Sequence, residues 1–465
     1  MPSSPNAAHP PLTEIRRLLE EREFFKLKDL LKGFQPAELV ELIEADDDTD
    51  HQAIVFRVLP LHLATQTFEL LDLGTQRHFL ETLSSEKMVE VLNEMAPDDR
   101  TELLEYLPDE LVRELILQLS EAERRVTLEL LGYPEDSVGR LMTPDYVAVR
   151  QDWTIGHVLD HVREYGRRAE TLNEIYVTER GVLLDAIRIH DVLLAAPTTR
   201  VSELMDRRFV ALQVMQDQEE ALRLFEKHDR VALPVVNPHG VLFGIVTVDD
   251  MLDVRAEEDT EDIQKLGGSQ ALEEPYLDTP LLTMVRKRVG WLVVLFLGEL
   301  LTATAMGYFE GEIAKAVVLA TFIPLIISSG GNAGSQATSL IIRGMALGEF
   351  SPRDWWLVLR RELVSGVLLG LALAALGFLR IGIWEMISPA TYGPHWAPIG
   401  FAVGFSVLGV VLWGTLAGSM LPLLLRRLGL DPATASAPFV ATLVDVTGLV
   451  IYFTFALVFL RGTLL

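Results

Sequence analysis

The 465-residue chain contains no cysteine. This absence excludes disulfide bonds and thiolate metal sites, so any metal ligands must be oxygen atoms or histidine imidazoles. Basic residues are also scarce: the chain has 40 Lys and Arg but 66 Asp and Glu, which gives a formal net charge of −26. A chain this acidic is not expected to bind nucleic acid or an anionic lipid surface, and its charge favours cations as partners.

Several motifs are missing as well. The first residues, MPSSPNAAHPPL, lack a basic stretch followed by an apolar core, so we expect no cleavable signal peptide. A glycine-rich segment is present, but it lacks the Gly-Lys-Ser/Thr ending and the preceding strand of a phosphate-binding loop. There is no His-Glu-x-x-His pair, which argues against a membrane-embedded metalloprotease. We therefore predict that the chain is not an enzyme and has no catalytic residues.

Charge and hydropathy divide the chain near residue 280. Residues 1–280 contain 28 Lys and Arg against 57 Asp and Glu, a net charge of −29. Residues 281–465 contain 12 against 9, a net charge of +3. The first part is long enough for two soluble domains. The second has long apolar runs with few charges, which is typical of a membrane domain.

Five apolar stretches in the second part reach the roughly 20 residues needed to cross the hydrocarbon core of a bilayer. They are 289–309, 314–342, 357–387, 397–425 and 434–460. An odd number of spans places the two chain ends on opposite sides. Nine basic residues precede the first span or lie in the loops on that side, against three on the other side. This bias predicts a cytoplasmic N-terminus and a C-terminus outside.

The second span is unusually polar, because it contains SSGGNAGSQATS at residues 328–339. Gly330 and Gly334 form a small-xxx-small pair, which suits either close helix packing or the approach of backbone oxygens to a cavity. Asn332 and Gln336 are difficult to place against lipid. Asn332 is therefore a candidate pore residue.

The fifth span contains an acid, Asp445, about eight residues inside the apolar run. An unpaired carboxylate there costs at least ~2.5 kcal/mol on insertion scales. It could pair with a basic residue of another span, but no Lys or Arg lies near the middle of any span. Pro438, as a proline inside a span, is expected to free backbone carbonyls that line a cavity. Glu299 in the first span is a second acid, for which a packing role and a functional role are both open.

These side chains predict a cation path through the membrane. Oxygen donors suit Mg²⁺, Ca²⁺ or Mn²⁺ rather than zinc or copper. Magnesium keeps several of its waters and is usually held by one or two carboxylates. One Asp445 from each of two chains would supply two carboxylates, so we expect a homodimer.

Residues 12–135 contain short amphipathic segments in tandem, such as APDDRTELLEYL and PDELVRELILQL. Each begins with Ser, Pro or an acid, which favours helix initiation. A period of about 12 residues predicts an all-α superhelical domain of stacked short helices. Its acids, including Asp98 and Asp99, are expected to lie on a solvated face.

Residues 136–254 contain an internal duplication. GRLMTPDYVAV recurs as SELMDRRFVAL, and RGVLLDAIRIHDVL recurs as HGVLFGIVTVDDML. Each unit is predicted to contain a short strand, a helix, two strands and a helix. The pair resembles tandem cystathionine-β-synthase (CBS) domains, an α/β regulatory module that often binds adenine nucleotides.

The resemblance places Thr247 and Asp250, in GIVTVDD, at the ribose-contacting positions of the second CBS unit. In the first unit, DAIRIHD has Asp185 and Arg188 in place of the glycine and threonine of that pattern. At most one ATP site per chain is therefore expected.

Acids crowd the segment DDMLDVRAEEDTEDIQKLGG, residues 249–268. A helix of this composition repels itself unless cations compensate its charge. Composition alone favours a solvated face. Its position between the duplicated region and the first span favours a regulatory role for residues 255–283, an acidic connecting helix.

The arrangement resembles the MgtE-type magnesium channel and transporter family over essentially the whole chain. The resemblance is carried by MAPDDR in the helical N-domain, the tandem CBS domains, TEDIQKLG in the connecting helix, and GGNAGSQAT and ATLVDVTGLVIYF in the spans. It implies a homodimeric protein of the bacterial inner membrane, embedded in membrane lipid. Residues 284–465 would form a five-helix pore domain, and the connecting helix would act as a plug.

The resemblance also implies site residues. Asp445 and Asn332 would bind hydrated Mg²⁺ in the pore, and Asp431, in LGLDPA, would form a peripheral ion position. High cytosolic Mg²⁺ would bridge acids of the N-domain, CBS pair and plug helix and close a passive pore. The matching sensor positions are Asp98, Asp217, Glu219, Asp229, Asp250, Asp253, Glu258, Glu261 and Asp262. The alternative is a coupled secondary transporter of Mg²⁺, Mn²⁺ or Co²⁺, in which Glu299 would be the coupling group.

Overall fold

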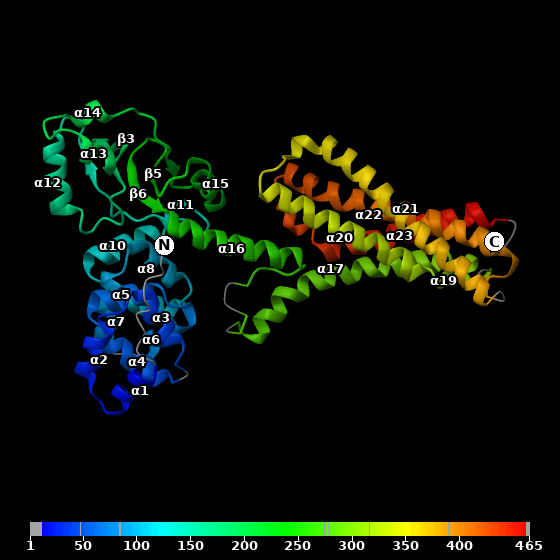
Figure 1. The fold of residues 1–465 in the computed structure, drawn as a ribbon, viewed down its shortest axis with the longest axis horizontal. Coiled ribbons are helices and arrows are strands. Elements are labelled where there is room, and N and C mark those ends of the chain that lie inside the picture. The colour runs from blue at the N-terminus through cyan, green and yellow to red at the C-terminus, as the bar shows by residue number, and fades with distance from the viewer. Residues whose placement is uncertain are drawn as a thin grey trace, which may run out of the picture. The chain divides into compact units, whose positions relative to one another are not determined.

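The computed structural model describes residues 12–46, 48–82, 85–272, 276–277, 279–315, 317–388 and 391–461. They form two compact units, of which the first ends at Glu257 and the second begins at Glu258. The boundary falls inside helix α16, Val248–Leu266. Figure 1 shows short helices and small sheets in the first unit and long helices in the second.

Short helices stacked on one another build the N-terminal part of the first unit. The described ones are α1 (Leu12–Glu20), α2 (Phe24–Leu31), α3 (Pro36–Glu44), α4 (Thr49–Val58), α5 (Leu61–Glu69), α6 (Leu73–Thr82), α7 (Ser85–Glu94), α8 (Pro97–Glu105), α9 (Asp109–Gln118) and α10 (Glu121–Leu130). Side chains cap some of them: Asp48 accepts the backbone N–H of Asp50, and Ser120 accepts that of Glu123. Their apolar faces share one core, so the predicted all-α domain is confirmed.

Two small sheets of identical topology follow. Their strands are β1 (Ala148–Val149), β2 (Glu174–Glu179) and β3 (Val182–Arg188), then β4 (Leu212–Gln213), β5 (Ala232–Val236) and β6 (Leu242–Thr247). In both sheets the first strand is parallel to the second, and the second is antiparallel to the third. The helices between and around them are α11 (Val138–Leu141), α12 (Ile155–Tyr165), α13 (Ile189–Leu194), α14 (Val201–Leu204), α15 (Gln218–His228) and α16. The predicted order of strand, helix, two strands and helix is therefore confirmed in both repeats.

Polar contacts join the helical part of the first unit to the duplicated part. Glu105 at the end of α8 forms an ion pair with Arg140 of α11. The hydroxyl of Tyr106 donates a hydrogen bond of 2.7 Å to a carboxylate oxygen of Glu257 in α16. The end of α8 consequently lies against the middle of α16, and Asp98 in the first turn of α8 interacts electrostatically with Asp250 in the first turn of α16.

The second unit contains long apolar helices. Its elements are α17 (Leu281–Tyr308), α18 (Glu310–Lys315), α19 (Val317–Ala320), α20 (Ile323–Ala346), η1 (Pro352–Asp354), α21 (Trp355–Ile387), η2 (Gly393–His395), α22 (Trp396–Arg427), η3 (Pro432–Thr434) and α23 (Ala437–Leu460). Five described helical stretches are long and apolar enough to cross a membrane. They agree with the five spans predicted from hydropathy.

Glycines bring α20 and α22 into backbone contact. A Cβ atom added at Gly414 would overlap the carbonyl oxygen of Gly330, and one at Gly418 would overlap that of Gly334. The hydroxyl of Thr338 also donates a 2.9 Å hydrogen bond to the carbonyl of Gly418. Gly330 and Gly334 therefore serve close packing, which fixes the rotation of α20 about its axis.

Candidate cation sites

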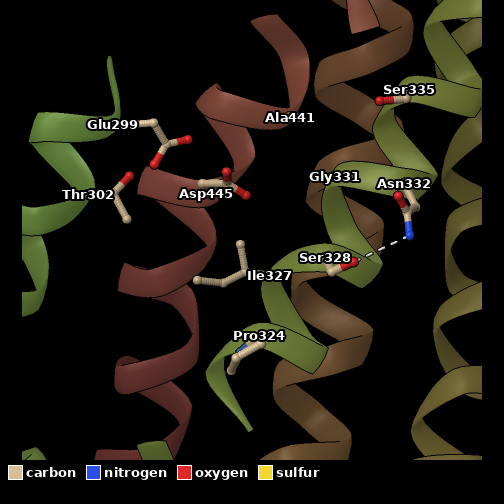
Figure 2. A pocket seen from close by; sticks show the side chains of 10 residues that line it. All are labelled: Glu299, Thr302, Pro324, Ile327, Ser328, Gly331, Asn332, Ser335, Ala441 and Asp445. Carbon is tan, nitrogen blue, oxygen red and sulfur yellow. Dashed lines mark hydrogen bonds between the residues drawn. The ribbon is translucent and has the colours of Figure 1, made fainter. Parts of the chain in front are cut away.

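A cavity of about 450 Å³ lies in the membrane unit between α17, α20 and α23. Figure 2 shows its side chains, with Asp445 and Glu299 on one side and the polar face of α20 on the other. The lining residues are Glu299, Thr302, Pro324, Ile327, Ser328, Gly331, Asn332, Ser335, Ala441 and Asp445. The structure thus brings together two predicted pore residues, Asp445 and Asn332, and adds Glu299.

Helical spacing accounts for this set. Ser328, Asn332 and Ser335 follow one another at intervals of four and three residues, so they share one face of α20. Ala441 and Asp445 are related in the same way on α23. Because glycines hold the opposite side of α20 against α22, the polar face must point toward α17 and α23.

Asp445 has no basic partner in the described part of the chain. The ion pairs found there do not include Asp445, and the carboxyl group of Glu299 lines the same cavity. On the far side of the cavity the amide of Asn332 donates a 3.4 Å hydrogen bond to the Ser328 hydroxyl.

The expected role of Pro438 is wrong. Helix α23 begins at Ala437 with Ser436 as its N-cap, so Pro438 lies in the first turn. A first-turn proline replaces an N–H that has no intrahelical partner, and it frees no carbonyl. The cavity therefore owes its polarity to side chains of α17, α20 and α23.

Asp431 lies in the loop between α22 and α23. One of its carboxylate oxygens accepts the N–H of Ala433, and the other lies 2.8 Å from the ammonium of Lys265. Burial lowers the pKa of Lys265, but hydrogen bonds to Asp431 and Glu261 outweigh burial and raise the pKa above its usual value. The structure thus places the predicted peripheral ion position beside a protein ammonium group.

An acidic cluster forms where α8 meets the start of α16 in the first unit. Asp98 is buried, which contradicts the solvated face expected for it, because packing of α8 against the duplicated region covers it. Burial, and then repulsion from Asp250 and Asp99, raises the pKa of Asp98 well above its ordinary value. Burial, with repulsion from Glu69 and Asp250, raises the pKa of Asp99 to about 8.

Asp250 and Glu69 also belong to this acidic cluster. Burial raises the pKa of Asp250 to about 7, although hydrogen bonds from Thr247 oppose the rise. Burial raises the pKa of Glu69 to about 7, again against a hydrogen bond, from the N–H of Ala96. Sequence reasoning missed Glu69, because it lies on α5, far along the chain from Asp250, and no motif marks it.

The other predicted sensor residues lie on the surface or in ion pairs. Asp217 caps α15, and Asp229 ends the same helix in a left-handed conformation with φ of 50°. Glu219 pairs with Arg223, and Glu261 with Lys265. Among the described residues, no three His, Asp or Glu side chains are close enough to hold one metal ion directly.

The remaining sensor residues, Asp253, Glu258 and Asp262, lie along α16. Burial, with repulsion from Asp249, raises the pKa of Asp253. The acids of α16 therefore extend from the cluster of the first unit toward Lys265.

Thr247 and Asp250, the predicted nucleotide contacts, are already bonded to each other. Both the N–H and the hydroxyl of Thr247 donate to one oxygen of Asp250, at 2.9 and 2.7 Å. In the first repeat Asp185 is buried and accepts the N–H of Arg207 at 2.9 Å. The two repeats therefore differ at the position that the nucleotide pattern requires.

Comparison with known proteins covers most of the chain. The family model of the MgtE divalent cation transporter matches residues 323–455, that of the MgtE intracellular N domain matches 34–136, and that of the CBS domain matches 138–197 and 201–257. The magnesium transporter MgtE of Thermus thermophilus is 37% identical over 454 residues, 96% of this chain and 98% of that protein. The magnesium transporter MgtE of Bacillus subtilis is 30% identical over 446 residues, 96% of each.

Solved structures match about half of the chain. A crystal structure of the cytosolic domain of the Mg²⁺ channel MgtE in complex with ATP has a TM-score of 0.50 and 34% identity, covering 52% of this chain and 99% of that one. The soluble part of a magnesium transporter, at 22% identity and a TM-score of 0.50, shows the same fold. With family matches in the N-terminal, CBS and membrane parts and 37% identity along nearly its whole length, the chain belongs to the MgtE family of magnesium transporters.

Proposed function

We propose that this protein is a passive Mg²⁺ channel whose pore contains Asp445. The observation that carries the proposal is a carboxylate that lines a polar cavity inside the membrane unit without a basic partner in the described residues. A carboxylate in this setting requires a cation, and a mobile cation defines a transport path. The magnesium transporters of Thermus thermophilus and Bacillus subtilis support the choice of ion.

The cavity suits an ion that keeps its water. Six waters occupy about 180 Å³ at their share of liquid volume, well within the cavity of about 450 Å³. Magnesium dehydrates reluctantly and is held by few carboxylates. Asp445 would supply charge, and Ser328, Asn332 and Ser335 would accept or donate hydrogen bonds to the bound waters. Inward flow would follow the membrane potential, at ~2.3 kcal/mol per charge per 100 mV.

The protein would act as a homodimer with its first unit in the cytoplasm. Two copies of Asp445 would face a shared axis, and Asn332, which is exposed in a single chain, would then face the pore. The excess of basic residues in the loops on one side supports this orientation in a bacterial inner membrane, with the C-terminus outside.

Cytosolic Mg²⁺ would close the channel through the acidic cluster of the first unit. Asp98, Asp99, Asp250 and Glu69 come from three elements, α5, α8 and α16. Burial, with repulsion among neighbouring acids, raises their pKa values, so ionising them together in the packed arrangement is costly unless a cation is bound. Hydrated Mg²⁺ would stabilise the packed arrangement, and its loss would let the acids separate. Binding to one state alone shifts the equilibrium by mass action. The acids of α16 and Asp217, Glu219 and Asp229 would add weak sites that steepen the response.

ATP would bind at the CBS pair as a modulator. The related cytosolic domain was solved in complex with ATP, and Thr247 and Asp250 occupy the matching positions of the second repeat. Because the Thr247 hydroxyl already donates to Asp250, this carboxylate is oriented before a ribose arrives.

A coupled secondary transporter is a second candidate. It is favoured by one observation, that Glu299 faces Asp445 across the same cavity and supplies a possible coupling group (Figure 2). Flux in purified proteoliposomes separates the two functions. A channel gives Mg²⁺ flux that is independent of proton and sodium gradients and that falls as Mg²⁺ on the cytoplasmic side rises. Flux that requires either gradient would establish the transporter, and no flux from folded protein would refute both.

A further inference from the structure

A second carboxylate, Glu299 of α17, lies at the depth of Asp445. At 1.5 Å per residue, Glu299 lies about 15 Å past Val289, the first residue after the basic run Arg286–Arg288. This distance is about half of a ~30 Å hydrocarbon core. Asp445 lies about 12 Å from the start of α23 by the same measure. Both acids therefore lie far from either membrane surface, where charge is costly.

The two carboxyl groups line the same cavity. Figure 2 shows Glu299 extending from α17 toward α23, and Asp445 on α23 with its oxygens turned toward α20. Neither forms an ion pair with a Lys or Arg in the described part of the chain. Two neighbouring carboxylates repel each other strongly where water is scarce, so the pair must either share a proton or take up a cation.

Thr302, one turn after Glu299 on α17, has a hydroxyl group that is available to a ligand in the cavity. Membrane threonines here commonly donate to the carbonyl four residues earlier, as Thr304 does to Leu300 at 2.9 Å and Thr447 to Leu443 at 2.7 Å. The hydroxyl oxygen of Thr302 is buried and has no hydrogen-bond partner among the described residues. It lines the cavity beside Glu299. Helix α17 therefore offers the cavity both a carboxylate and a free hydroxyl.

We propose that Glu299 is a second ligand of the transported ion, so that one chain presents a Glu–Asp pair to each divalent cation. This inference rests on the proposed function, because it assigns Glu299 to the pore of Asp445. A pair of charge −2 within one chain balances a divalent ion and attracts it more than a monovalent one. Glu299 consequently sets the preference for divalent over monovalent cations.

Glu299→Gln tests this role in the full-length protein. The variant keeps the side-chain shape but removes one charge from the pair. We expect the Mg²⁺ concentration at half-maximal flux to rise roughly tenfold, the scale of one charge-assisted contact, and the ratio of Mg²⁺ to Na⁺ flux to fall. Glu299→Asp should recover part of the Mg²⁺ affinity and part of the selectivity for Mg²⁺ over Na⁺. Glu362→Gln is the matched control, because Glu362 lies on α21 outside the lining of the cavity.

The outcomes separate this inference from the proposed function. Wild-type protein without Mg²⁺ flux would refute the channel itself. Wild-type flux together with Glu299→Gln flux of unchanged affinity and selectivity would overturn the role of Glu299 and leave the channel standing. If Glu299→Asp behaves no better than Glu299→Gln while both variants elute and melt as wild type does, the claim that the charge matters fails.

Discussion

The ammonium nitrogen of Lys265 lies 2.8 Å from Oδ2 of Asp431. This pair fastens the C-terminal end of α16 to the loop that precedes α23, the helix that carries Asp445. Glu261 also pairs with Lys265, so two carboxylates share one ammonium group. A protein cation would therefore compete with Mg²⁺ for the peripheral position predicted at Asp431.

Lys265→Met removes this contact. Partly exposed ion pairs contribute about 0.5–1 kcal/mol, so we expect the cytosolic Mg²⁺ concentration that closes the channel to shift about two- to fivefold. The shift should be upward, because the plug helix loses an attachment to the pore domain. Patch recordings with Mg²⁺ titrated on the cytoplasmic side measure it. Lys32→Met, which breaks a surface pair with Asp29 of 2.9 Å in the N-domain, is the control, and equal behaviour of the two variants would contradict the prediction.

Asp445→Ala should abolish Mg²⁺ uptake while the protein stays folded. A charge-assisted contact of about 1.5–3 kcal/mol is lost, which corresponds to a ten- to hundredfold loss of flux or more. Growth of a magnesium-auxotrophic host and proteoliposome flux both measure this change. Thr447→Ala, on the same helix and engaged with Leu443 and Trp413 outside the cavity, serves for comparison. If the Asp445→Ala variant restored growth, the assignment of Asp445 to the pore would be wrong.

The acidic cluster makes the stability of the first unit depend on pH. The folded pKa values of Asp99, Asp250 and Glu69, about 8, 7 and 7, exceed ordinary carboxyl values. The folded unit therefore binds more protons than the unfolded one, and its stability falls as pH rises from about 4 to about 8. Millimolar Mg²⁺ should reverse much of the fall above pH 7. Calorimetric melting of the full-length protein across this range, with and without Mg²⁺, provides the test, and a profile that Mg²⁺ leaves unchanged would count against the sensor.

Neutralising Asp250, Glu258 and Glu261 together should leave the channel open at high cytosolic Mg²⁺. Loss of three carboxylates removes much of the binding energy that favours the closed state, so the Mg²⁺ response should shift at least tenfold. The matched variant neutralises Glu20, Glu21 and Glu110, acids outside the cluster in the N-domain. Normal closure of the triple variant in patch recordings would show that these acids do not sense Mg²⁺.

Gly414→Ala should destabilise the membrane unit. Its Cβ would overlap the carbonyl oxygen of Gly330, and overpacking of this kind costs about 1–3 kcal/mol. We expect a lower melting temperature in detergent and a lower flux per folded protein, because α20 must shift. Gly382→Ala has no atom within 4 Å of the added Cβ and should melt like the wild type. Equal melting of the two variants would contradict the close packing.

Hydropathy and repeats were sufficient to predict the three-part architecture, because each element type has its own spacing of apolar residues. Asp445 was predictable for the same reason, since a carboxylate inside an apolar run stands out against its neighbours. Pro438 was misplaced because hydropathy does not distinguish the first turn of a helix from its middle. The N-cap Ser436 decides that boundary, and only the backbone shows it.

The acidic cluster could not be derived from the sequence. Asp98 and Asp250 are separated by most of the first unit along the chain, and the packing of α8 near α16 brings their charges together. Periodicity describes which face of a helix is apolar, but it does not say which polar face another domain covers. The carboxyl pair of Glu299 and Asp445 was hidden in the same way, because it depends on which side of α17 meets α23.

The length of helix α21 can be compared with the thickness of the membrane around this protein. It runs from Trp355 to Ile387 and is 33 residues long, about 50 Å at 1.5 Å per residue, whereas the hydrocarbon core measures ~30 Å. Trp356 and Trp384 lie about 42 Å apart along it, close to the full thickness of a bilayer with its headgroups. The helix must tilt or carry its ends among the headgroups. The tilt of α21, and of the helices packed against it, therefore depends on the thickness of the bilayer and on the chain length of its lipids.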